Sequence, residues 1–222
     1  MQLLLRGENL ETEVQMSLFG SSNEEELSSN RTIKYDKNVQ MAAIVDEVSR
    51  CTACRLHLTR TNTVPGEGAL DARLMFIGEG PGADEDAKGR PFVGAAGKLL
   101  TSIIAAMGMK REDVFIGNVV KCRPPENRVP EKDEMESCIG YIRRQIKVIK
   151  PRVIVLLGAT AYKAMIPDAK EGITKARGKV IRIDGIDYMP TFHPAALLRD
   201  PSKKPDVWAD MKKVMAMLRE EM

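Results

Sequence analysis

The stretch Leu74–Phe92, LMFIGEGPGADEDAKGRPF, decides the fold of this chain. Its first four residues are apolar and partly aromatic, which is the pattern of a buried strand. The glycines and the proline at positions 78, 80, 81 and 82 then impose a tight turn. Glu79 lies inside that turn. In an open α/β sheet ligands bind at the carboxyl ends of the strands, so the sequence predicts that Glu79 faces a substrate.

A glycine-rich loop after a strand can also bind phosphate. This loop lacks the Lys-Ser/Thr ending of a P-loop and the spacing of a dinucleotide fingerprint. Three acidic residues, Asp84, Glu85 and Asp86, follow it and disfavour a bound triphosphate. We therefore interpret the loop as catalytic.

Apolar runs and turn residues predict strands that alternate with helices. The predicted strands are 73–78, 114–120 and 152–158, with a hairpin formed by 179–183 and 186–191. The predicted helices are 39–50, 95–107, 131–149, 159–165 and 205–222. This alternation predicts an α/β protein of three layers, αβα, around a central and mostly parallel sheet.

The composition allows one ample core, because 43% of the 222 residues are hydrophobic. No apolar run approaches the ~20 residues of a membrane helix. The apolar start, Met1–Leu5, is too short for a signal peptide and is soon followed by Glu8 and Glu11. We expect a cytoplasmic protein that does not contact membranes, and we expect a monomer.

Residues 1–38 differ from the rest of the chain in charge. They carry a net charge of −3, whereas residues 39–222 carry +6. Their polar runs, such as Gly20–Glu26, predict a flexible N-terminal arm that precedes one domain over residues 39–222. A modestly basic domain suits a protein that binds the DNA backbone, although many ordinary enzymes share this balance.

A second motif lies near the C-terminus. A short strand, 188–192, runs into His193–Arg199, HPAALLR. GEGPG after one strand and HPAAL after a late one resembles the motif pair of the uracil-DNA glycosylase superfamily. Glu79 and four cysteines make residues 40–221 similar to the family-4, iron–sulfur enzymes. This resemblance implies a base-excision-repair enzyme that flips uracil out of DNA and hydrolyses its N-glycosidic bond, leaving free uracil and an abasic site.

The four cysteines are Cys51, Cys54, Cys122 and Cys138. A disulfide framework is not expected in a cytoplasmic chain, because that compartment keeps thiols reduced. The CxxC pair disfavours scattered core cysteines, and the spacing alone leaves zinc and an iron–sulfur cluster open. The resemblance implies that these four residues hold a 4Fe–4S cluster that ties segments together, since hydrolysis moves no electrons.

The two motifs supply the predicted catalytic residues. Glu79 would orient or deprotonate the attacking water and stabilise positive charge on the sugar. His193 would donate a hydrogen bond to uracil O2 as the base leaves, and its alternative is a capping or core histidine. Gly80 and Glu85 are predicted to bind substrate, with Glu85 near the edge of the uracil ring.

Two further residues are predicted to recognise uracil. In the resembled family the aromatic residue that matches Phe92 stacks on the flipped base, and the alternative is a core phenylalanine. Asn118 lies at the exit of a predicted strand. Its amide can accept from uracil N3–H and donate to O4, whereas cytosine presents the opposite pattern. The alternative for Asn118 is a turn-forming or capping residue.

The loop after His193 is predicted to contact DNA. Ala195 would let backbone N–H groups approach phosphate, Arg199 would add a cation, and Leu197 or Leu198 would fill the gap left by the flipped base. The alternative for either leucine is the first turn of a helix packed on the core. Surface cations would add to DNA binding as a group: Lys121, Arg123, Arg128, Lys203 and Lys204.

The arm contains one more motif, Gln15–Phe19, QMSLF. It resembles the short peptide by which bacterial repair and replication proteins bind the sliding clamp. Gln15, Leu18 and Phe19 would enter a pocket of the clamp, and the alternative is a segment without a partner.

Two functions without turnover also remain open. A uracil-DNA binding protein of the same superfamily would capture uracil through a loop histidine, but residues 119–129 contain none. A cluster-bearing scaffold for damaged DNA would not need Glu79, Asn118 and His193 together. The other histidine, His57, receives no catalytic role.

Overall fold

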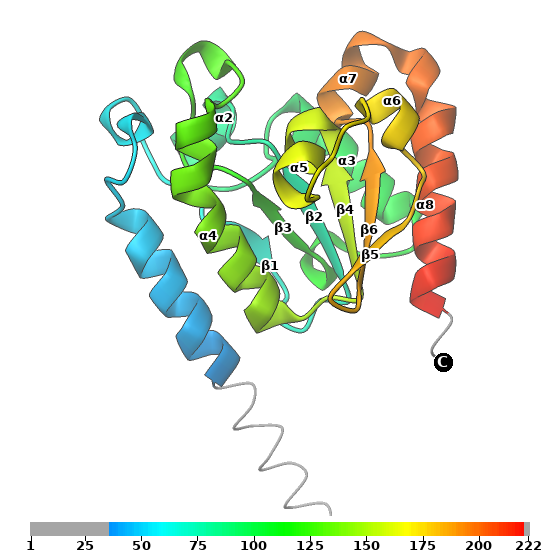
Figure 1. The fold of residues 1–222 in the computed structure, drawn as a ribbon, viewed down its shortest axis with the longest axis horizontal. Coiled ribbons are helices and arrows are strands. Elements are labelled where there is room, and N and C mark those ends of the chain that lie inside the picture. The colour runs from blue at the N-terminus through cyan, green and yellow to red at the C-terminus, as the bar shows by residue number, and fades with distance from the viewer. Residues whose placement is uncertain (1–35, 220–222) are drawn as a thin grey trace, which may run out of the picture. The chain divides into compact units, whose positions relative to one another are not determined.

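The computed structural model in Figure 1 describes residues 36–219. The chain divides into two units, Met1–Val39 and Gln40–Met222, and the fold below is that of the second unit. The predicted arm and its clamp-binding peptide lie outside the described residues, apart from residues 36–38. None of the helices between residues 36 and 219 is long and apolar enough to cross a membrane.

The centre of the fold is a six-stranded sheet with the order β1-β3-β2-β4-β6-β5. The strands are β1 (Glu67–Gly68), β2 (Leu74–Gly78), β3 (Phe115–Asn118), β4 (Val153–Leu157), β5 (Ile181–Ile183) and β6 (Ile186–Thr191). The four inner strands are parallel, while β1 and β5 pair antiparallel at the two edges. All residues of β2 and β4 are buried, as expected for parallel strands that are covered on both faces.

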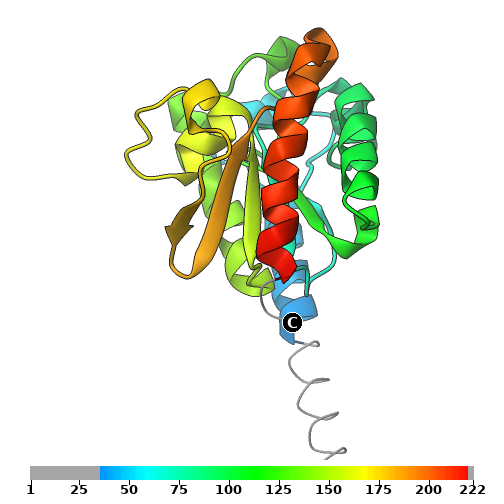
Figure 2. The ribbon, with the colours of Figure 1, turned by 90° about the vertical axis from the view of Figure 1, so that its right-hand side faces the viewer.

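Helices cover both faces of this sheet. They are α2 (Ala83–Lys88), α3 (Ala95–Ala106), α4 (Lys132–Ile149), α5 (Gly158–Met165), α6 (Ile173–Ala176), α7 (Pro194–Arg199) and α8 (Lys204–Arg219), with short 3₁₀ turns η1 (Arg55–Leu58), η2 (Arg111–Asp113), η3 (Pro125–Asn127) and η4 (Pro201–Lys203). The N-terminal helix, which ends at residue 49, packs on one face with α4 and α5, and α3 and α8 pack on the other (Figures 1 and 2). The predicted three-layer αβα fold is therefore confirmed.

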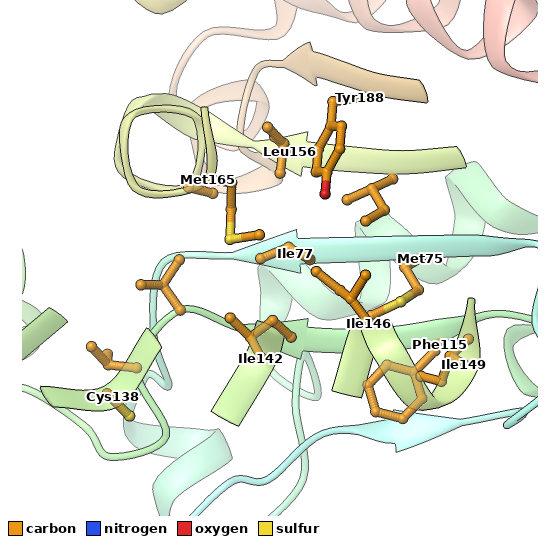
Figure 3. Close-up of a cluster of buried hydrophobic side chains, with 14 of the residues drawn as sticks. Met75, Ile77, Phe115, Cys138, Ile142, Ile146, Ile149, Leu156, Met165 and Tyr188 are labelled. Carbon is orange, nitrogen blue, oxygen red and sulfur yellow. The ribbon is translucent and has the colours of Figure 1, made fainter. Parts of the chain in front are cut away.

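The alternation of side chains along the strands builds two cores. Met75 and Ile77 of β2 point to the α4 side, where Ile142 and its neighbours pack against them (Figure 3). Leu74 and Phe76 point to the opposite side and join the core under α3 and α8. Each such side chain stabilises the fold by roughly 1.5–3 kcal/mol through its burial. This packing fixes where each strand ends, and hence where the loops after the strands lie.

The hairpin of β5 and β6 turns through two residues. Ile183 pairs with Ile186, and the residues between them, Asp184 and Gly185, have φ of 50° and 80°. An Asp-Gly pair with both φ values positive is favoured in tight hairpins, because its twist matches that of the strands. The turn sets the register of β6, whose carboxyl end leads to His193.

Several elements differ from the prediction. β3 ends at Asn118 rather than at residue 120, and α2, α6, α7 and β1 were not predicted. α2 has no apolar period. Its first turn instead carries Asp84, Glu85 and Asp86, whose charges favour a helix N-terminus. The HPAALLR segment, predicted as a loop, forms α7 with His193 as its N-cap.

Candidate active site

The candidate site lies at the carboxyl edge of the parallel strands. Glu79 directly follows β2, Asn118 ends β3, and His193 comes two residues after β6. Backbone bonds hold the first two loops together: the N–H of Val119 donates to the carbonyl of Gly78, and that of Val120 to the carbonyl of Glu79. The parallel order of β2, β3 and β6 thus brings residues that are far apart in sequence to one edge of the sheet (Figure 1).

Asn118 carries a buried oxygen without a partner. The residue is 1% exposed, and its Oδ1 accepts no hydrogen bond from any described residue. Gly78 lies opposite Asn118 across the β2–β3 pair, and a Cβ on Gly78 would lie 2.5 Å from Oδ1. Leaving a buried acceptor unpaired costs about 1–3 kcal/mol, so a donor from outside the chain is expected to reach this oxygen.

Phe92 lies beside this amide in a strained conformation. Its φ is 50°, which is unusual for a bulky residue, and it is 6% exposed. A Cβ on Gly97 would lie 1.9 Å from the Phe92 carbonyl oxygen, so only glycine lets α3 approach this backbone. A Cβ on Gly78 would lie 2.6 Å from the Phe92 ring. Strain of this kind gathers at ligand sites, where the surrounding structure maintains it.

Glu85 holds the loop that carries Phe92. Its Oε1 accepts from the backbone N–H groups of Val93 at 2.8 Å and Gly94 at 2.9 Å, and its Oε2 accepts from that of Gly82 at 3.2 Å. These bonds join the start of α2 to the start of α3. They assign Glu85 a positioning role, and the predicted contact with the edge of the uracil ring stays a prediction.

His193 faces the Phe92 ring, with their centroids 5.6 Å apart and the rings inclined at 34°. The backbone N–H of Ala195 donates to Nδ1 at 3.1 Å. Burial is the main cause that lowers the pKa of His193 to about 4, with a smaller lowering from the positive charge of Arg199 and an opposing effect of the negative charge of Glu85. The imidazole is therefore neutral at pH 7. Because Nδ1 accepts, Nε2 carries the proton and is a donor.

Thr160 binds the carboxylate of Glu79. This residue, which was not predicted, lies in the first turn of α5 and donates from Oγ1 to Glu79 Oε2 at 2.5 Å. Two residues earlier, Gly158 has a φ of 91° and approaches His193 so closely that a Cβ would lie 3.1 Å from the Cβ of His193. The start of α5 thus contacts both predicted catalytic residues. The sequence signal that could have indicated Thr160 is its position shortly after the end of β4, at the same edge of the sheet as Glu79.

Gly80 lies where two loops approach closely. A Cβ at this position would lie 2.6 Å from Cγ2 of Val120, so a larger residue would push the Glu79 turn away from the loop after β3. This contact explains the glycine structurally. Its predicted contact with substrate stays a prediction.

The two leucines of α7 point in different directions. Leu197 is 2% exposed and belongs to the core under α3 and α8, whereas Leu198 is 48% exposed. The predicted DNA contact of Leu197 is therefore wrong: this residue packs inside the protein. Leu198 and the exposed Arg199 remain available to DNA, and the N–H of Ala195 is bound to His193.

The predicted group of DNA-binding cations is only partly exposed. Lys121 was wrongly placed in it: the residue is 1% exposed, its Nζ donates to Oε1 of Gln145 at 2.8 Å, and burial lowers its pKa to about 8. Arg128 forms two bonds with the buried carboxylate of Glu134, at 2.7 and 2.8 Å. The three other predicted cations lie nearer the surface. Arg123 donates a hydrogen bond to Asn127, Lys203 donates one to Asp200, and Lys204 is exposed.

The four cysteines lie around one small cavity. Cys51 and Cys54 follow the N-terminal helix, Cys122 lies in the loop after β3, and Cys138 lies on α4. Two donors point at these sulfurs: Arg60 Nη1 lies 3.1 Å from the Cys122 Sγ, and the backbone N–H of Lys121 lies 3.2 Å from the Cys138 Sγ. Burial raises the pKa of Cys122 and raises that of Cys138 to about 11.

Between residues 36 and 219, no group of three or more His, Cys, Asp or Glu side chains is placed to hold a metal ion. His57 also lines the cavity, and its Nδ1 lies 2.8 Å from the carbonyl oxygen of Cys54. We assign His57 no role in the candidate active site.

Comparison with known proteins decides the family. Residues 65–212 match the model of the uracil DNA glycosylase superfamily. The chain belongs to the uracil-DNA glycosylase superfamily. Within it, the chain is 48% identical to a type-4 uracil-DNA glycosylase of Thermotoga maritima over 190 residues, which cover 84% of this chain and 99% of that protein. The predicted resemblance is thereby confirmed.

Other type-4 members of this superfamily match to a similar degree. The type-4 uracil-DNA glycosylase of Sulfurisphaera tokodaii is 49% identical over 77% of this chain and 81% of its own length. That of Archaeoglobus fulgidus is 46% identical over 77% of this chain and 89% of its own length. These relatives span almost the whole described fold in length, so the comparison concerns the entire domain rather than one motif.

Proposed function

We propose that this chain is a uracil-DNA glycosylase of DNA base excision repair: it flips uracil out of DNA and hydrolyses its N-glycosidic bond. The observation that carries the proposal is the unpaired, buried Oδ1 of Asn118 beside Phe92 and His193 at the carboxyl edge of the sheet. The named relatives of the family support the same activity.

Asn118 selects uracil by its hydrogen-bond pattern. Uracil N3–H donates to Oδ1, and the amide nitrogen of Asn118 donates to uracil O4. Cytosine has no hydrogen on N3 and places an amino group at the other position, so both groups of the amide would face the wrong partner. Each mismatch costs about 1–3 kcal/mol in a buried site. The ring of Phe92 provides an apolar face for the base.

The base must leave the duplex before it reaches these residues. Leu198 is the exposed apolar residue of α7 and fills the gap in the base stack, and Arg199 next to it binds a phosphate. Leu197 contributes to this step only indirectly, because its burial anchors α7 on the core.

Glu79 activates the water. Its carboxylate accepts a proton from water as the oxygen attacks C1′ of the sugar, and the C1′–N1 bond breaks. The electron pair of that bond goes to the base, which leaves as an anion with charge on O2. The bond from Thr160 fixes one oxygen of Glu79 and leaves the other for water.

His193 stabilises the leaving base without transferring its proton. The neutral ring donates from Nε2 to uracil O2, and this bond strengthens as negative charge develops. One donor of this kind typically contributes about 10²–10³ in turnover.

A uracil-containing duplex oligonucleotide tests the proposal. The expected products are free uracil and a strand that alkali cleaves at the abasic site, with no product from a matched duplex that contains cytosine. A stable protein–DNA adduct would instead show a uracil-binding protein, and neither product nor adduct would show a scaffold without turnover. Either of those two results would overturn the proposal.

We further propose that Cys51, Cys54, Cys122 and Cys138 hold a 4Fe–4S cluster. The donor set fits it: four thiols line one cavity, and two N–H groups point at sulfur. The bound cluster ties the N-terminal helix, the loop after β3 and α4 together. Four iron atoms per chain and visible absorbance, both lost in Cys138→Ala, are expected; stoichiometric zinc would overturn this proposal.

We also propose that Gln15, Leu18 and Phe19 bind a sliding clamp, on the sequence pattern alone, because this segment lies outside the described residues. Gel filtration with a bacterial clamp is expected to show co-elution that is lost when Leu18 and Phe19 are changed to alanine. No shift, or the same shift with the double variant, would dispose of this partner. The same column tests the expected monomer.

A further inference from the structure

Two hollows lie along α4 on the face away from α3 and α8. The first, of about 580 Å³, lies between α4 and α5, with Met135, Ile139 and Thr160 in its wall. The second, of about 670 Å³, lies between the C-terminal half of α4 and the β5–β6 hairpin. Arg143 lines both hollows, so they are neighbours along α4, and together we call them the α4 groove.

The α4 groove begins next to the catalytic carboxylate. Thr160, which lines its upper end, is the residue whose hydroxyl binds Glu79. Lys132 marks this end and Lys150 the other, so the groove follows α4 from its first residue to its C-cap. An α-helix of 18 residues is about 27 Å long. One end of the groove is therefore adjacent to the candidate active site through Thr160, and the groove is longer than one nucleotide.

The side chains of this groove combine cations with an apolar floor. Its basic residues are Lys132, Arg143, Lys147, Lys150 and Lys163, and its acidic residues are Glu136 and Asp184. Lys132 pairs with Glu136 at 3.6 Å. The other four basic side chains form no ion pair or side-chain hydrogen bond with any residue between 36 and 219. Apolar side chains, including Ile139, Ile146 and Ile183, lie between them.

We propose that the α4 groove binds the single-stranded DNA that flanks the uracil on one side. The inference rests on the proposed function and names where its substrate continues beyond the active site. Unpaired cations attract phosphates, and an apolar floor accepts sugars and bases whatever their sequence. An acidic peptide would satisfy the charges, but it would not explain why one end of the groove is lined by Thr160, which binds Glu79. At 3.4 Å or more per nucleotide, ~27 Å accommodates about four to eight nucleotides.

The test compares single-stranded substrates with different flanks. Each oligonucleotide carries one uracil with two or ten nucleotides on the 5′ side and two or ten on the 3′ side, and kcat/KM is measured for each. For the parent protein, extending one flank is expected to raise kcat/KM by about tenfold or more, with little effect of the other flank. The gain should decrease steeply with salt.

The groove variant is a triple variant that carries Arg143→Gln, Lys147→Gln and Lys163→Gln. Its matched control is a triple variant that carries Lys98→Gln, Lys110→Gln and Lys212→Gln. The control removes the same charge at three exposed positions outside the groove. The groove variant should excise uracil from the short oligonucleotide like the parent, lose the gain from the long flank, and reduce the slope of log kcat/KM against log salt by about 2. The control should keep the gain.

Three results would overturn the inference: no flank effect in the parent, a groove variant that keeps the full effect, or a control that loses it equally. Failure of the proposed function looks different, because the parent would then release uracil from none of the oligonucleotides. Uracil excision from the short oligonucleotide by the groove variant also shows that this variant is folded.

Discussion

The carboxyl edge of the sheet and the Lys121–Gln145 network beside the cysteine cavity differ in whether their buried polar groups are paired. At the carboxyl edge, Asn118 keeps an unpaired oxygen, Phe92 has a positive φ, and the pKa of His193 lies far below its ordinary value. Beside the cysteine cavity, the buried Lys121 donates to Gln145, which in turn donates to the carbonyl of Pro65 at 2.8 Å.

This difference distinguishes a site from a scaffold. Buried polar atoms are normally paired, so a network in which each member has a partner stabilises the fold and needs no ligand. An unpaired buried oxygen and a strained aromatic residue lower the stability of the fold, and a bound substrate would offset this loss of free energy. Changes at the carboxyl edge should therefore alter turnover more than stability, and the predictions below test this separation.

The largest effect is expected for His193→Ala. Turnover on uracil should decrease by about 10²–10³, because the lost hydrogen bond is strongest in the transition state. Binding of uracil-containing DNA and the unfolding temperature should change little. Single-turnover rates, DNA titration and thermal unfolding of the parent and the variant check this. Equal losses of binding and turnover would contradict the assignment.

Thr160→Val should decrease turnover by about tenfold or more, because a hydrogen bond to a charged group such as the Glu79 carboxylate typically contributes about 1.5–3 kcal/mol. Thr160→Ser keeps the hydroxyl and should restore most of the rate. If Thr160 acts only through Glu79, then Thr160→Val should cost little more in a Glu79→Gln background. Fully additive losses in this double-mutant cycle, or no rescue by serine, would show that Thr160 merely supports the fold.

The two leucines of α7 offer a matched pair. Leu198→Ala should decrease excision from duplex DNA by about fivefold and leave single strands unaffected, because the wedge only replaces a stacked base. Leu197→Ala should instead destabilise the fold by about 2–5 kcal/mol, since it leaves a cavity in the core. Urea unfolding and excision rates separate the two effects. A reversed pattern would place the wrong leucine at the DNA.

The smallest effect concerns pH. With the pKa of His193 at about 4, turnover should not decline between pH 8 and 6 through protonation of this residue. Stability should decrease as pH falls from about 6.5 toward 4, because the unfolded chain, with its ordinary histidine pKa, binds the proton first. Rate and unfolding profiles of the parent and His193→Gln check both statements. A His193-dependent decline of turnover centred at pH 6.5 would contradict the lowered pKa.

The inner strands and long helices could be predicted to within a few residues. Apolar runs between glycines and prolines indicated β2 and β4, and helical spacing indicated α3 and α4. The missed elements depend on other forces. Acidic residues in the first turn favour α2, and the His193 N-cap favours α7. β1 has only two residues, which is too short for an apolar pattern.

The site was partly predictable because its motifs follow strands. Glu79, Asn118 and His193 were identified as polar residues at strand exits, where a fold of this class binds ligands. The role of Thr160 depends on how α5 packs beside β2, which no local pattern encodes. Lys121 resembled a surface cation, and its burial depends on Gln145, which comes 24 residues later.

The most direct test of the account is the Asn118→Asp variant. A carboxylate can still accept from uracil N3–H but cannot donate to O4, and its charge opposes the anion that forms on the leaving base. Excision is measured for the parent and the variant on duplexes that differ only in uracil or cytosine. We predict that the variant loses most of its uracil excision and gains at most a low activity on cytosine. A variant that removes uracil at the parental rate would show that Asn118 is structural and that uracil is recognised elsewhere.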